Sequence, residues 1–183
     1  MALPSFRTWV ANTIHTAAEL NVDLRDNGKF LLNPPQCRAY HNATQAITTA
    51  TLTAVALNSE RFDRESGAAS TMHSTVSNTS RVTPLVAGVY DLKGNIQFAA
   101  QATAAGYRAV YLRLNGTTYI AGMMVPTTTV FNAVPIPLSV ATTYEFNGST
   151  DYGELVVLHT AGVNLNVEAS TGHQCELTVI RVG

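Results

Sequence analysis

Charged residues are scarce in this sequence. Lys, Arg, Asp and Glu make up 13% of its 183 residues, about half of the usual ~25%. The 11 basic residues nearly balance the 12 acidic ones, and the basic residues form no run. Proteins that bind nucleic acid in general build a field of Lys and Arg, so we expect no nucleic-acid partner. The hydrophobic share of 46% is ordinary and argues against disorder.

Long apolar runs and cysteines are also few. No run approaches 18 consecutive apolar residues, so we expect no membrane insertion. The opening MALPSFRTWV lacks the apolar segment of a signal peptide, and we expect no cleavable secretion signal. Cys37 and Cys175 are the only cysteines. We interpret them as two small buried residues in a compartment that tolerates thiols.

Recognisable patterns for catalysis and metal binding are missing too. The five His residues show no ligand spacing, and no G-x-S-x-G, P-loop, G-x-G-x-x-G or H-E-x-x-H is present. We therefore predict a protein that is not an enzyme, with no catalytic residues, cofactor or metal. Two alternatives stay open. A polysaccharide hydrolase needs only two acids about 5–9 Å apart in a cleft, and an ion on a threefold axis needs only one His per chain.

The composition changes near Pro34-Pro35 and divides the chain into a leader, residues 1–35, and a main domain, residues 36–183. In the leader, Thr16-Ala17-Ala18-Glu19 matches the capping box, in which the first and last side chains each bond a backbone amide of the other. The residue before a proline avoids helical conformation, so the helix ends before Pro34. The spacing predicts one helix over about residues 17–32.

This helix carries a narrow apolar stripe. Leu20, Leu24 and Leu31 recur at intervals of four and seven residues. An isolated helix of this length is marginal in water. The helix therefore needs a partner, which could be the main domain, its symmetry mates or another protein.

After Pro35 the sequence has the composition of β-strands. Thr, Val, Ala, Tyr and Ile form short runs that Gly, Asn and Pro interrupt. This predicts an all-β sandwich of about ten strands, with one short helix before it. The expected strands are Gln36–Tyr40, Thr51–Asn58, Ser80–Pro84, Gly88–Ala99, Tyr107–Leu114, Thr117–Ala121, Val134–Ala141, Glu154–His159, Val163–Glu168 and Gln174–Arg181.

Local patterns support particular elements. Between Gly88 and Ala99, apolar residues alternate with polar ones, which is typical of a half-buried strand. Asn115-Gly116 predicts a type I′ hairpin turn, because both residues accept a positive φ. The segment Pro126–Pro137 predicts a long loop that leads into an edge strand.

The order of several motifs resembles the tumour-necrosis-factor-like jelly roll, in particular its complement one-q globular-head branch. Phe62-Asp63 is followed by Asn78-Thr79-Ser80-Arg81-Val82-Thr83-Pro84-Leu85-Val86-Ala87-Gly88-Val89-Tyr90, and later by Leu112-Arg113-Leu114-Asn115-Gly116. The resemblance covers about residues 37–183 and implies a ten-stranded jelly roll that forms a homotrimer. The family has Phe before Thr-Ala-Pro where this sequence has Arg81-Val82, and Asp after Gly where this sequence has Val163. The calcium sites of the family are therefore not carried over.

The leader is similar to the short N-terminal segment of many tailed-bacteriophage virion proteins. The similarity lies in Arg7-Thr8-Trp9-Val10, Thr16-Ala17-Ala18-Glu19-Leu20-Asn21 and Val22-x-Leu24-Arg25-Asp26. It implies a virion protein, made in the bacterial cytoplasm and attached to other virion proteins through this segment. The expected anchoring residues are Trp9, Leu20, Leu24 and Leu31.

Together these features favour a structural virion protein with a trimeric knob. We favour a tail or fibre protein that contributes to host attachment, with a capsid decoration protein as the alternative, and a free-standing binding module as a third hypothesis. For the core or the trimer interface, we expect Tyr90, Phe98, Tyr111 and Leu177. For loops that contact a host-surface glycan, we expect Phe131, Tyr144 and Tyr152.

Overall fold

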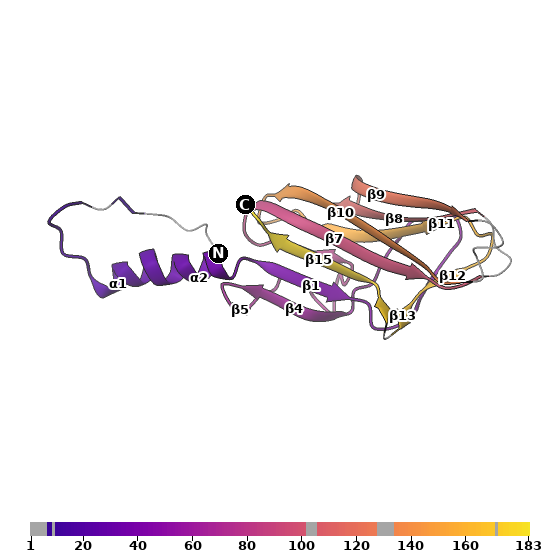
Figure 1. The fold of residues 1–183 in the computed structure, drawn as a ribbon, viewed down its shortest axis with the longest axis horizontal. Helices are drawn as coiled ribbons and strands as arrows, with labels where there is room; N and C mark the ends of the chain where they lie inside the picture. The colour runs from indigo at the N-terminus through magenta and orange to yellow at the C-terminus, as the bar shows by residue number, and fades with distance from the viewer. Residues whose placement is uncertain (1–6, 9, 102–105, 128–133, 171) are drawn as a thin grey trace.

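The computed structural model describes residues 7–8, 10–101, 106–127, 134–170 and 172–183. Two antiparallel sheets face each other in a sandwich, and a helix extends from one end of it (Figure 1). In chain order, the strands are β1 (Gln36–Tyr40), β2 (Gln45–Ile47), β3 (Thr53–Ala54), β4 (Ser59–Glu65), β5 (Ala68–Ala69), β6 (Arg81–Val82), β7 (Gly88–Phe98), β8 (Gly106–Leu114), β9 (Thr118–Thr127), β10 (Ile136–Phe146), β11 (Gly153–His159), β12 (Leu165–Val167), β13 (Ala169–Ser170), β14 (His173–Gln174) and β15 (Glu176–Arg181).

The strands pair in a nested order. The first sheet runs β2-β12-β7-β15-β1-β4-β5, with β10 also paired to β7. The second runs β3-β11-β8-β9, with β6 also paired to β11, and β13 and β14 form a separate hairpin. Thus β1 pairs with β15, β7 pairs with β10, and β8 pairs with β9. This is the pairing of a jelly roll, so the predicted all-β fold class is confirmed.

The core lies between the sheets and follows the alternation in the sequence. Tyr90 and Phe98 of β7 and Leu177 of β15 are fully buried within the single chain. The Tyr90 hydroxyl donates a hydrogen bond to the Val86 carbonyl at 2.8 Å. Of the two roles expected for these residues, they therefore fill the core. Tyr111 of β8 differs, because it is half-buried on the outer face of its sheet.

Several strands differ from the prediction. The expected strand Thr51–Asn58 is reduced to β3, while β4, with the sequence SERFDRE, was not predicted because most of its residues are charged. The strand β9 continues past the predicted end at Ala121, through Gly122. A Cβ atom on Gly122 would lie 2.3 Å from Cδ1 of Tyr111, so the tyrosine ring covers this glycine and the strand does not break there. The short strands β2, β5, β13 and β14 were also missed.

The two cysteines are free and buried, as predicted. Cys37 lies in β1, and Cys175 directly precedes β15. Burial raises the pKa of the Cys37 thiol, and it raises the pKa of Cys175 to about 11. Both thiols therefore stay protonated at neutral pH and act as small core side chains.

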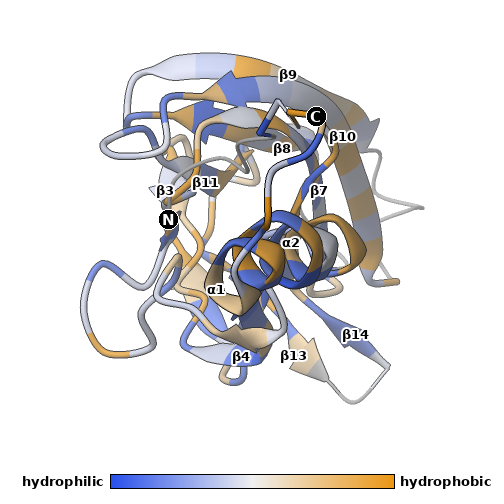
Figure 2. Ribbon diagram, turned by 90° about the vertical axis from the view of Figure 1, so that its left-hand side faces the viewer, coloured by the Kyte–Doolittle hydropathy of each residue, from blue (hydrophilic) through white to orange (hydrophobic). Residues whose placement is uncertain are grey.

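The leader forms one helix with the predicted bounds. It comprises α1 (Ala17–Leu20), a π-helical segment η1 (Asn21–Asp26) and α2 (Asn27–Leu32). Figure 2 views the molecule from the end where this helix lies. Phe30 is buried and lies beneath the Arg181 guanidinium, 5.1 Å from it, which seats the last turn against the sandwich. Within the described chain, no helix is both long enough and apolar enough to span a membrane.

Candidate interaction surfaces

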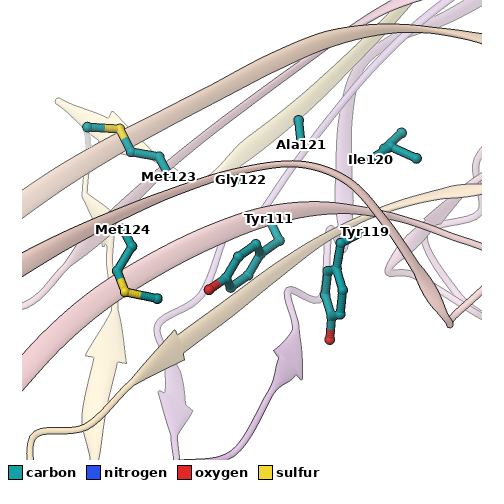
Figure 3. Close-up of a pocket in the computed structure, with 7 residues that line it drawn as sticks. All are labelled: Tyr111, Tyr119, Ile120, Ala121, Gly122, Met123 and Met124. Carbon is teal, nitrogen blue, oxygen red and sulfur yellow. The ribbon is translucent and has the colours of Figure 1, made fainter.

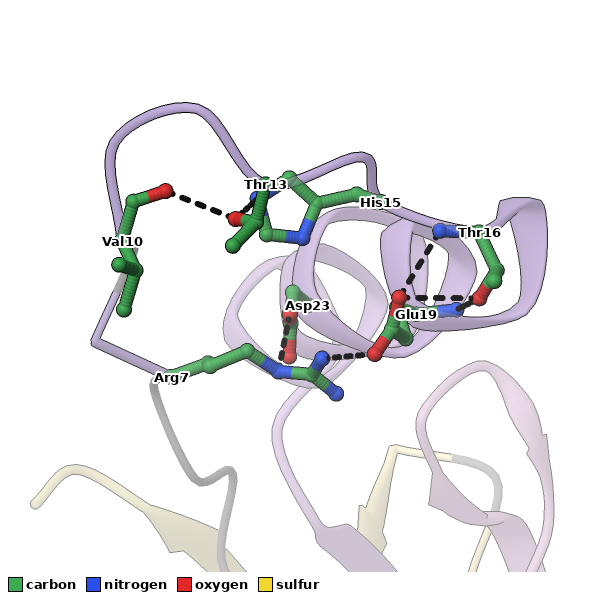
Figure 4. A network of polar contacts seen from close by, with 7 residues as sticks. All are labelled: Arg7, Val10, Thr13, His15, Thr16, Glu19 and Asp23. Carbon is green, nitrogen blue, oxygen red and sulfur yellow. Dashed lines mark hydrogen bonds and ion pairs between the residues drawn. The ribbon is translucent and has the colours of Figure 1, made fainter.

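The start of the helix is held by a polar network (Figure 4). The Thr16 hydroxyl accepts a hydrogen bond from the Glu19 amide at 3.2 Å, and the Glu19 carboxylate accepts one from the Thr16 amide at 2.8 Å, so the predicted capping box is formed. Arg7 contacts Glu19 and lies 3.3 Å from Asp23. The Thr16 amide and Arg7 lower the pKa of Glu19 to about 2. These contacts tie the segment before the helix to its first turns.

The apolar stripe of the helix faces solvent. Leu20 is 38% exposed, Leu24 63% and Leu31 64%. The main domain of the same chain therefore does not cover the stripe, which is open to a symmetry mate or another protein. Trp9, the fourth expected anchoring residue, lies outside the described residues.

A second apolar surface lies on the outer face of β8 and β9 (Figure 3). Tyr111, Tyr119 and Met124 project from the same side of the sheet, and the two tyrosine rings lie 5.1 Å apart. Tyr119 is 46% exposed and Met124 52%. With Gly122 beneath the Tyr111 ring, they line a shallow hollow of about 410 Å³.

The edge of the sandwich at which β9 and β10 lie is uncharged over most of its length. Between Arg113 and Glu145 the sequence has no charged residue and no histidine. Among the described strands, β9 pairs only with β8, and β10 only with β7, so each leaves one edge unpaired. Exposed edge strands usually carry charges or other features that prevent pairing with another chain. A long uncharged edge is typical of a surface that another chain covers.

A polar hollow of about 360 Å³ lies between residues 71–83 and the segment that precedes β11. The Arg81 guanidinium stacks on the Tyr152 ring at 4.3 Å. Thr71, Thr83 and Thr150 contribute hydroxyl groups to the lining.

A row of charges crosses three strands beside this hollow. The register places Arg81 of β6 next to Glu154 of β11, and Glu154 next to Arg113 of β8. Arg113 donates two hydrogen bonds to one Glu154 oxygen, at 2.8 and 3.1 Å, and Ser80 donates one to the other oxygen at 2.9 Å. Arg81 lies further away, at 3.7 Å. Glu154 is 3% exposed, so this buried carboxylate is satisfied mainly by Arg113 and Ser80.

The three expected recognition residues fall in different places. Tyr144 lies in β10, half-buried with its ring 5.3 Å from that of Phe146, so its expected position in a loop is wrong. Its side chain shares the core face of β10 with Phe146 because the side-chain period of a strand is two. Tyr152 lines the polar hollow. Phe131 lies outside the described residues.

The sequence interpretation did not assign Arg81 and Tyr119 to surface hollows, or Glu154 to the buried centre of the charge row. For Arg81 a signal was present, because Arg81-Val82 replaces the Phe of the family pattern. The other two carry no such signal, since the burial of Glu154 and the exposure of Tyr119 depend on which strands become neighbours.

No family model and no curated protein matches the sequence. Solved structures do match the fold. The crystal structure of murine APRIL at pH 5.0 has a TM-score of 0.56 and 9% identity, and the match covers 81% of this chain and 98% of that one. The fold is a tumour-necrosis-factor-like jelly roll. The Eiger TNF from S. frugiperda matches with a TM-score of 0.51 and 13% identity over 81% of this chain and 94% of its own. The tumour-necrosis-factor-like part covers most of the chain.

Within the described residues, no group of three or more His, Cys, Asp or Glu side chains is placed to hold a metal ion.

Proposed function

We propose that this chain is the subunit of a homotrimeric structural protein of a tailed-bacteriophage virion. Its leader attaches to the particle, and its tumour-necrosis-factor-like knob faces outward as part of the tail or a fibre. The observation that carries the proposal is the exposed stripe of Leu20, Leu24 and Leu31 on a helix that extends beyond the sandwich. A helix of this length gains most of its stability from packing, so it is built to meet a partner.

The uncharged edge supports the trimer. Burial of charged side chains between subunits requires paired charges, whereas β9 and the part of β10 that precedes Glu145 bring none to the contact. Closed rings of identical subunits cover such edges without leaving a free one. Met123, Met124 and Tyr119 are exposed there and would be buried by a second copy.

The orientation of the knob limits where host contacts occur. The register places the end of β10 beside the start of β7, so the segment of residues 147–152 lies at the same end as the leader. A leader bound to the particle would hold Tyr152 close to the particle. In this proposal, host attachment belongs to the opposite end, where β9 ends and β10 begins.

The test changes the stripe without changing the knob. We expect Leu24→Lys to reduce the copies incorporated into phage particles at least tenfold, because a charge would be buried at the attachment site. Asp26→Asn changes the charge by the same amount on another face of the helix, and we expect normal incorporation. Full incorporation of Leu24→Lys would contradict the proposal. Images of labelled particles with the protein on the head shell would favour a decoration protein and contradict the tail assignment.

A further inference from the structure

We propose that the hollow at Arg81 and Tyr152 binds a carboxylate side chain of an acidic peptide segment, supplied by the particle protein to which the leader attaches. This inference rests on the proposed function, because the location of the hollow at the leader end identifies the partner. The geometry of the hollow indicates that the ligand group is a carboxylate.

Arg81 has hydrogen-bonding capacity left for a ligand. Its nearest carboxylate oxygen, on Glu154, is 3.7 Å away, which is beyond hydrogen-bond distance. That carboxylate already accepts bonds from Arg113 and Ser80. The row of two guanidinium groups and one carboxylate has a net charge of +1. Asp151, next in sequence to Tyr152, has its oxygens bonded to Asn115 Nδ2 and to the Asn147 amide.

The guanidinium is also held in a fixed orientation. Its central carbon lies over the Tyr152 ring, 4.3 Å from the ring centroid, and a guanidinium packed on an aromatic face can still donate its in-plane N–H groups. The Arg81 side chain is 41% exposed, so a ligand can reach it. A planar fork of donors matches the two oxygens of a carboxylate.

Hydrogen bonds fix both walls of the hollow. His73 donates its backbone N–H to Asp63 at 3.0 Å, and its ring nitrogens bond Glu60 at 2.8 Å and the Thr79 carbonyl at 3.0 Å. These bonds fix the segment of residues 71–79. Because the walls are already ordered, a ligand costs little ordering entropy on binding.

The opposite wall is fixed through two asparagines. Asn115 accepts a hydrogen bond from the Tyr152 amide at 2.9 Å. The Asn147 side-chain oxygen accepts bonds from the amides of Ser149, Thr150 and Asp151. Within the described chain, the hydroxyls of Thr71 and Thr83 make no hydrogen bond and are available for the peptide backbone.

The position favours a peptide of the particle over a host glycan. The strand β1 begins opposite Ile180, close to the end of β15, and the helix leads directly into it. The hollow is at this same end, since Tyr152 precedes β11 and Gly153 pairs with Leu114 at the end of β8. A protein bound to the leader therefore approaches the hollow.

The test is a titration of the full chain followed by NMR. The probe is the peptide acetyl-Gly-Asp-Glu-Gly-amide, and its neutral counterpart is acetyl-Gly-Asn-Gln-Gly-amide. We expect saturable shifts of the Arg81 Nε–H and Tyr152 ring signals with the acidic peptide alone, weakened by added salt. Arg81→Gln should weaken binding at least tenfold. Arg61→Gln is the matched control. The Arg61 guanidinium carbon lies 4.5 Å from the centroid of the Tyr40 ring, and Arg61 does not line this hollow. The Arg61→Gln protein should therefore bind the acidic peptide normally.

A second variant separates loss of the ligand contact from misfolding of the protein. Arg81→Lys keeps the charge beside Glu154 but loses the planar fork, and we expect severalfold weaker binding. Equal shifts with both peptides, or no saturable shift, would overturn the inference. So would tighter binding of glucuronate than of the acidic peptide, because this would assign the hollow to a glycan. Incorporation of the Leu24 and Asp26 variants does not involve the hollow, so that experiment separates failure of this inference from failure of the proposed function.

Discussion

At the scale of single residues, two glycines show how backbone conformation and space act separately. Gly148 and Gly162 both have positive φ angles, of 73° and 77°. A Cβ atom on Gly148 would lie 2.2 Å from the Ala87 amide nitrogen, whereas one on Gly162 would meet nothing within 4 Å. The first glycine is required by conformation and by contact, and the second by conformation alone.

We therefore expect Gly148→Ala to lower the free energy of unfolding by about 3 kcal/mol or more. Gly162→Ala should lower it by about 1 kcal/mol, the cost of the backbone angle. Urea denaturation of both variants measures the difference. Equal losses would show that the turn at residue 148 moves away from Ala87.

His159 gives the fold a dependence on pH. Its side chain is fully buried, with Nε2 donating to the Ile47 carbonyl at 2.9 Å and Nδ1 accepting from the Ala161 amide at 3.3 Å. Burial lowers its pKa, and the charge of Arg108 lowers it further. The neutral ring is thus the form that the folded chain holds.

Because the folded pKa is below the unfolded value, the unfolded chain binds the proton first as the pH falls. Stability is then lost below about pH 6.5, by at most about 1.4 kcal/mol per pH unit from this group. We expect His159→Gln to be less stable at pH 7 and to lose less stability between pH 7 and 5. Denaturation curves at several pH values measure this, and parallel curves for the two proteins would contradict it.

At the scale of elements, the long strands and the helix could be predicted, but several short strands could not. Period-two alternation identifies β7, and the Asn115-Gly116 turn between β8 and β9 has the two positive φ angles that were expected. Charged β4 and the two-residue strands carry little pattern of their own. They are strands because a neighbour pairs with them, as β1 does with β4.

The charge row across β6, β11 and β8 should contribute to the stability of the fold. Glu154→Gln leaves Arg113, whose side chain is 19% exposed, without its carboxylate. We expect a loss of about 3 kcal/mol, the lower range for a broken buried pair. The exposed pair of Asp91 and Lys93 is the control, and Asp91→Asn should cost less than about 1 kcal/mol. Similar losses in thermal denaturation would show that Glu154 is not the centre of the row.

At the scale of the whole molecule, composition anticipated the sandwich but not the polar hollow. The hollow brings together residues 71–83 and 150–152, which only the nested strand order makes neighbours. The exposed stripe on the helix was predicted as a pattern, but its exposure depends on where the helix leaves the sandwich. The uncharged stretch of sequence is likewise a proposed subunit contact only in the context of the whole molecule, because the fold places β9 and β10 at the rim.

A charge at this edge should disrupt assembly. We expect Met123→Lys to weaken association at least tenfold, because the added charge would be buried between subunits. Leu52 is 43% exposed and Met123 42%, so Leu52→Lys is a matched control outside the edge and should assemble normally. Sedimentation velocity compares the variants. Equal effects of both changes would remove β9 from the subunit contact.

The most direct test of the proposed homotrimer is the mass of the full chain in solution, measured by sedimentation equilibrium over a range of concentrations. We expect a species with three times the mass of one chain. A stable monomer at all concentrations would contradict it.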